Sequence, residues 1–213
     1  MDSTSKKDAG ATAIAANTLC QQCGICCDGT LFATVTAHEE ERDDSGPEIH
    51  KNETGKFFFD QPCSKFTDRT CSIYAARPTS CRLFQCQLQK NIMNGSQSLE
   101  EGVDIVSGVK LSAEELTDWA KQNSNKDLKA ISLCGFLDWY QNKALRDNRP
   151  WQMPLSDRDN VLKAFEWLKI VDRYFVPSRT LARFADLIQK FSSEEKRPLS
   201  DRIKGFFFNS SQD

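Results

Sequence analysis

The chain has 213 residues, enough to bury a hydrophobic core as one domain or as two small ones. Its 39% hydrophobic and 27% charged residues are typical of a globular protein and exclude a disordered or fibrous one. The net charge of -2 argues against nucleic-acid binding, and no stretch is apolar enough to predict a membrane span.

The first 18 residues are polar, with a short alanine-rich run that is too weakly apolar for a secretory signal. We predict that residues 1–18 are a mobile leader and that the protein is cytoplasmic. In a reducing cytosol, clustered cysteines serve more often as metal ligands or redox groups than as disulfides. The odd total of nine cysteines agrees with this interpretation.

The leader is followed by the densest group of cysteines, CQQCGICC, over residues 20–27. Cys-x2-Cys spacing lets two sulfurs turn toward one point from a tight loop, and a third thiol at Cys26 could complete a three-point site. A turn at Asp28-Gly29, a strand over residues 31–36, an acidic solvated loop and an aromatic strand near residues 57–60 are predicted next.

A second group of cysteines occupies residues 63–86. Two short segments around Thr67-Asp68-Arg69-Thr70 predict a hairpin, and Arg77-Pro78 predicts the start of a helix. Cys81 and Cys86 are five residues apart and would not share a helix face well. Either the helix ends near Phe84 or the two thiols serve different metal positions.

Eight of the nine cysteines are therefore candidate metal ligands, because Cys sulfur prefers soft ions such as zinc, copper(I) or iron-sulfur iron. Adjacent Cys26 and Cys27 point apart in most backbone conformations, which indicates two sites, or one site plus a reactive thiol. Cys134 is expected to be a buried small apolar residue. The candidate ligands are Cys20, Cys23, Cys26, Cys27, Cys63, Cys71, Cys81 and Cys86.

Thiolates gathered around a metal need compensating positive charge. Arg77 and Arg82 lie next to or near the cysteines, and we predict that both donate hydrogen bonds to sulfur and help to bind the cofactor. Lys65 and Arg69 could act in the same way or be ordinary surface cations. His38 and His50 lie in polar loops and are expected to be surface residues.

From about residue 98 the sequence predicts helices. Ser98 with Glu101, and Ser112 with Glu115, are capping-box pairs that predict two helix starts. Apolar residues at helical spacing predict three further helices over residues 133–144, 161–175 and 181–191, and a short terminal helix near 199–207. We interpret these apolar stripes as core.

The whole pattern predicts an α+β fold with three parts. A mobile leader (1–18) precedes an irregular cysteine-rich metal-binding region with short strands (19–110), and a mostly helical region (111–213) follows.

The order CxxCGxCC, then PC, then CxIYxxRPxxCRxFxC resembles the zinc- or iron-chelating CxxCxxCC cysteine-cluster family (YkgJ-like proteins). The resemblance covers roughly residues 18–110 and implies a metal or iron-sulfur site on the cysteines that match. Flagellin lysine methylases are similar in the same motif, but no glycine-rich methyl-donor loop accompanies it here.

Three functions agree with these observations. The first is a zinc- or iron-binding protein, which could carry a [4Fe–4S] cluster, acting in electron transfer or redox chemistry with a redox partner. The second is a structural zinc module of an interaction protein, and the third is a metal carrier that passes its ion to a client protein. Whether the chain is an enzyme stays open.

Overall fold

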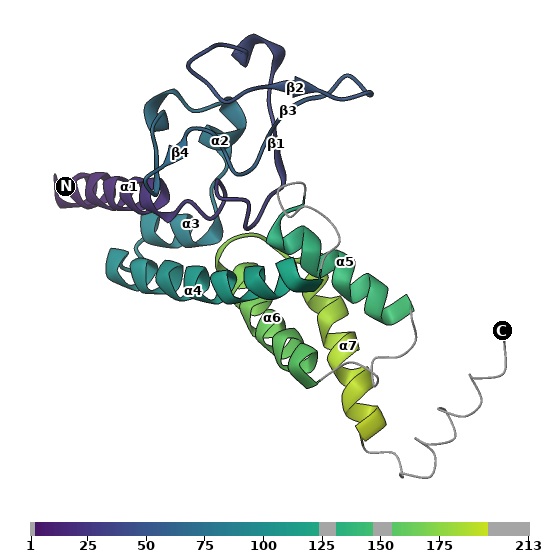
Figure 1. Ribbon diagram of the computed structural model, residues 1–213. Helices are drawn as coiled ribbons and strands as arrows, with labels where there is room; N and C mark the ends of the chain where they lie inside the picture. Colours follow the sequence, from purple (N-terminus) through teal and green to yellow (C-terminus); the bar gives the residue numbers. More distant parts are fainter. Residues whose placement is uncertain (1–2, 124–130, 147–154, 196–213) are drawn as a thin grey trace.

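The computed structural model describes residues 3–123, 131–146 and 155–195, and its fold is α+β as predicted (Figure 1). Helix α1, short strands and two short helices that carry the candidate ligands come first in the chain, and helices α4 to α7 follow. No helix in these three ranges is both long enough and apolar enough to cross a membrane.

The strands form two small antiparallel sheets. In the first, β3 (Phe57–Asp60) lies between β1 (Thr34–Thr36) and β2 (His50–Lys51). In the second, β4 (Phe66–Thr67) pairs with β5 (Thr70–Cys71), which confirms the predicted hairpin. The strand predicted from residue 31 begins only at Thr34, because Leu31 is buried and its N–H donates to the Ile25 carbonyl.

Residues 3–23 form helix α1 (Ser3–Cys23), where the sequence predicts a mobile leader. Alanine has the highest helix propensity, and the alanine-rich run lies in the middle of this helix. Ala16 and Leu19 are buried and join the main core, so the end of α1 is held by packing as well as by propensity.

The segment that carries Cys81 and Cys86 is divided between two helices. Helix α2 (Thr79–Leu83) begins after Pro78 and ends at Leu83, and α3 (Gln87–Met93) begins after Cys86. The helix therefore ends near Phe84, which was one of the two arrangements that the spacing left open.

Helix α4 (Leu99–Asn123) replaces the two helices predicted for residues 98–120. The first capping box is confirmed, because the Glu101 N–H donates to Ser98 Oγ at 3.1 Å and the Ser98 N–H donates to Glu101 Oε2 at 2.8 Å. The second predicted start is wrong. Ser112 lies inside α4, where no proline interrupts the helix, and the same residue spacing there only marks the exposed face. The predicted domain boundary at residue 110 falls within this continuous helix.

The remaining helices are α5 (Leu133–Arg146), α6 (Leu155–Tyr174) and α7 (Arg179–Glu195), which agree with the predicted apolar stripes. Their buried faces join α1, α3 and α4 in one hydrophobic core. The helix predicted near residues 199–207 lies outside the described residues.

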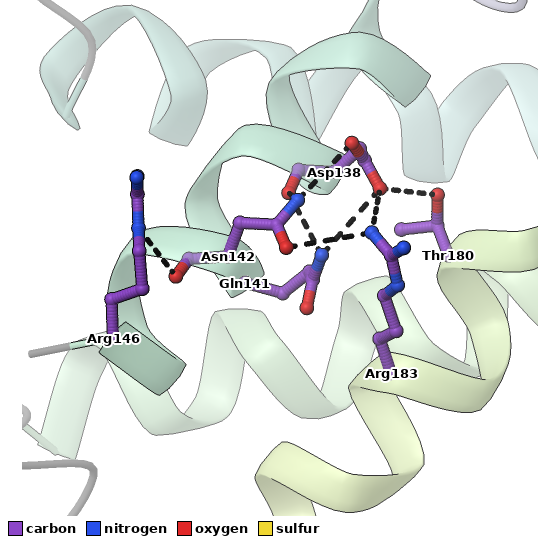
Figure 2. Close-up of polar contacts among 6 residues, drawn as sticks. All are labelled: Asp138, Gln141, Asn142, Arg146, Thr180 and Arg183. Atoms are coloured by element: carbon purple, nitrogen blue, oxygen red, sulfur yellow. Dashed lines mark hydrogen bonds and ion pairs between the residues drawn. The ribbon is translucent and has the colours of Figure 1, made fainter. Parts of the chain in front are cut away.

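A polar cluster joins α5 to α7 beside this core (Figure 2). Arg183 pairs with Asp138 at 3.3 Å, and Thr180 Oγ1 donates to the same carboxylate at 3.4 Å. Gln141 is fully buried; its Nε2 donates to the Asp138 carbonyl at 3.0 Å, while its Oε1 has no partner among the described residues. The cluster fixes the pairing of the two helices at the cost of one unsatisfied acceptor.

Candidate metal centre

All eight predicted ligands line one cavity of about 550 Å³. Four of them come from residues 20–27 and four from residues 63–86, so the fold brings the two cysteine groups together. Every one of these thiols is free and half-buried. The rest of the wall is mainly apolar. Leu83 belongs to this wall and is 77% exposed, so the cavity reaches the surface beside it.

The first cysteine group lies at the end of α1 and in the turn that follows. Cys20 and Cys23 are in the last turns of the helix. Gly24 ends the helix in the left-handed region (φ +71°), and its carbonyl accepts hydrogen bonds from the Cys27 N–H at 2.7 Å and from the Asp28 N–H at 2.9 Å. This turn brings Cys26 and Cys27 back toward the helix. A Cβ atom at Gly24 would overlap the Phe66 ring, so glycine is required on two grounds.

The second group reaches the cavity from three short elements. The Cys63 N–H donates to the Cys27 carbonyl at 2.8 Å, which ties the two groups together through the backbone. Cys71 is in β5 opposite Phe66, and Cys81 is in α2. Cys86 precedes α3, where its sulfur accepts a hydrogen bond from the Gln89 N–H at 3.4 Å.

The surroundings raise the pKa of six of the eight thiols and so favour their neutral form. Burial, followed by neighbouring thiols, raises the pKa of Cys23 to about 12 and that of Cys81 to about 11. The pKa values of Cys26 and Cys27 are also raised, first by burial and then by neighbouring thiols. A metal ion must therefore displace protons from sulfur when it binds, as it does at thiolate sites generally.

The two predicted arginines differ in position. Arg77 lines the cavity; its Nη1 lies 3.9 Å from Cys20 Sγ, and its guanidinium stacks on the Tyr74 ring at 3.6 Å. Its charge also acts to lower the pKa of Cys81. Arg82 is exposed, does not line the cavity, and donates from Nη2 to Thr79 Oγ1 at 3.0 Å. The structure thus places Arg77, and not Arg82, beside the thiols.

Two charged residues near the site were not predicted from the sequence. Lys110, on α4, donates from Nζ to the Cys23 carbonyl at 2.9 Å, and its charge acts to lower the pKa of Cys23. Glu41 accepts the Thr79 N–H at 2.6 Å and so anchors the first turn of α2, which carries Cys81. No local motif marks either residue, since each acts on a partner far away in the sequence.

The remaining candidates lie elsewhere. Cys134 packs against the core on α5, and burial raises its pKa to about 12. His38 is exposed, and His50 lies in β2 at 3.5 Å from the Asp60 carboxylate. Lys65 Nζ lies 3.5 Å from the Asp44 carbonyl, and Arg69 is in the hairpin turn with φ +62°.

The donor set fits a thiophilic metal, because it consists of thiols alone on the wall of one cavity. As the side chains stand, no three Cys, His, Asp or Glu residues in the described ranges are close enough to hold one ion. Metal binding therefore requires the sulfurs to turn inward from the cavity wall.

Comparison with curated proteins and with solved structures gave no match. Residues 19–101 match a family model described as "CxxCxxCC: Putative zinc- or iron-chelating domain". The matched residues include all eight cysteines of the cavity and exclude Cys134. Residues 19–101, which make up less than half of the chain, are therefore similar to the domains that this family model describes.

Proposed function

We propose that the chain binds zinc or iron through the cysteines of the cavity, and that the bound metal is redox-active iron, present as an iron-sulfur cluster. The observation that supports metal binding is the convergence of eight free thiols on one cavity, while the remaining cysteine is kept apart in the core. Thiols this close resist ionisation, since their thiolates repel one another, and a bound cation relieves this repulsion.

The size and opening of the cavity favour a cluster over a single ion. A volume of about 550 Å³ is many times the roughly 30 Å³ that a water molecule occupies in the liquid. The opening at Leu83 gives a redox partner access to one side of the cavity. A buried cluster whose cavity reaches the surface on one side could exchange electrons with a partner that docks there.

A structural zinc site is the second candidate, and the short strands favour it. No described strand has more than four residues, so the ladder hydrogen bonds of this half are few. Metal-ligand bonds would then supply folding free energy directly, as they do in small zinc domains.

Purification without oxygen, followed by metal and sulfide analysis and a visible spectrum, tests the proposal. We expect iron with acid-labile sulfide and a brown colour that bleaches reversibly on reduction. A colourless protein with stoichiometric zinc would refute the redox proposal in favour of the structural one. A protein that retains neither metal after reconstitution with each would refute metal binding itself.

A further inference from the structure

We propose that the eight thiols form two separate four-sulfur sites, side by side, that meet at the Cys26-Cys27 peptide bond. The inference rests on the proposed metal binding, but not on which metal is bound, because zinc and a [4Fe–4S] cluster each take four thiolates. The first set is Cys20, Cys23, Cys26 and Cys86, and the second set is Cys27, Cys63, Cys71 and Cys81.

The first set lies on a pair of packed helices. Two members are in the last turns of α1, the third is in the turn after it, and the fourth immediately precedes α3. Helices α1 and α3 pack on each other, and Leu19 and Leu88 are both in the core beside them. Among the neighbouring thiols, Cys86 and Cys20 raise the pKa of Cys23 most, and both are in this set.

The second set lies on the hairpin side of the cavity. Cys63 is tied to Cys27 by the 2.8 Å backbone hydrogen bond, and Cys71 is in the hairpin strand. Among the neighbouring thiols, Cys81, Cys63 and Cys71 raise the pKa of Cys27 most, in that order. Cys63 and Cys71 are likewise the thiols that raise the pKa of Cys81.

The two sets approach each other around Cys27, and β5, which carries Cys71, also packs against α1. Among the electrostatic neighbours of these thiols, the pairs that cross between the sets are Cys26 with Cys27 and Cys20 with Cys27. Consecutive side chains diverge from the backbone, so one peptide bond can present Cys26 to one site and Cys27 to the other.

The cations beside the cavity agree with this division. Four thiolates around a divalent ion leave a net negative charge at each site, which nearby cations offset. Lys110 contacts the backbone of Cys23, in the first set. Arg77 acts on Cys20 and on Cys81 and so stands between the two sets.

The test removes two thiols in different combinations from the full-length protein and measures Zn²⁺ bound per chain after stripping and anaerobic reloading. The parent is expected to bind two ions. The double variant C23S/C86S loses two thiols of the first set, and C71S/C81S loses two of the second; each should retain one tightly bound ion. The variant C23S/C71S loses the same number of thiols, one from each set, and should weaken binding at both sites. Equal losses in all three variants, or a parent that binds one ion, would overturn the division.

A second measurement on the unmodified sequence guards against variants that fail to fold. Protein loaded with one Zn²⁺ per chain is alkylated, and the protected cysteines are identified by tandem mass spectrometry. Protection is expected in one set of four or the other on a given molecule, with Cys134 insensitive to zinc. Protection in mixtures of the two sets would overturn the division while leaving metal binding intact. No protection at any cysteine would instead refute the proposed metal binding.

Discussion

Substituting Gly24 by alanine tests whether the turn between the two halves of CQQCGICC is built as described. The residue has φ +71°, and an added Cβ would overlap the Phe66 ring. The left-handed conformation costs a non-glycine residue about 1–2 kcal/mol. Displacing a packed ring costs about 1–3 kcal/mol more, so we expect Gly24→Ala to lower the free energy of unfolding by about 2–5 kcal/mol.

Substitutions at two other glycines separate the backbone cost from the cost of displacing the ring. Gly95 has φ +74° with open space around it, so Gly95→Ala should show only the backbone cost of about 1–2 kcal/mol. Gly108 is in α4, also with nothing near it, and Gly108→Ala should stabilise the protein by about 0.5–1 kcal/mol. The effect of alanine on the unfolded chain is similar at all three positions, so it largely cancels in the comparison.

The assay is urea unfolding of the metal-loaded protein, followed by circular dichroism, for the parent and the three variants. Combining Gly24→Ala with Phe66→Leu should recover part of the loss, because the smaller side chain gives the methyl group room. If Gly24→Ala costs no more than Gly95→Ala, the close approach of Phe66 to the turn is not real, and the described geometry of the site is wrong.

Three further outcomes follow from the contacts described above. Arg77→Gln should weaken metal retention roughly 10–100-fold in a chelator competition, whereas exposed Arg82→Gln should leave it unchanged; equal effects would contradict the difference in their positions. Cys134→Ser should leave the metal content unaltered but lower the free energy of unfolding by about 1–3 kcal/mol, because a hydroxyl would be buried without an assured partner, and a loss of metal would make it a ligand. Removing the metal with a chelator should make residues 20–90 sensitive to protease before the helices beyond residue 123, and simultaneous cleavage of both would show that the metal does not stabilise the first part preferentially.

The sequence predicts the helices after residue 130 well, because their apolar positions recur at the helical period and the core uses them directly. It also predicts which cysteines reach the cavity, since their spacing sets eight thiols apart from Cys134. It does not predict α1, an alanine-rich helix without a clear apolar face, or the continuity of α4 through Ser112.

The charged groups around the thiols were harder to predict, for a geometric reason. Arg82 follows Cys81 directly, but adjacent residues on a helix point about 100° apart, and its side chain lies outside the cavity. Lys110 reaches the carbonyl of Cys23 across 87 residues of sequence. Closeness in sequence therefore suggested a contact between Arg82 and the thiols that is absent among the described residues. The contact of Lys110 with Cys23 joins residues far apart in sequence, and no local pattern indicates it.

The wall of the cavity is not built by residues 19–101 alone. Val106, on α4, and Phe175, just after α6, line it together with the cysteines, and the Phe175 carbonyl accepts the N–H of Gln87 at 3.4 Å. Val106 and Phe175 both lie beyond residue 101, where the family match ends. A chain cut at that residue would keep all eight cysteines of the cavity and lose these two apolar residues of its wall. The helices beyond residue 101 thus complete the wall of the cavity that the cysteines line.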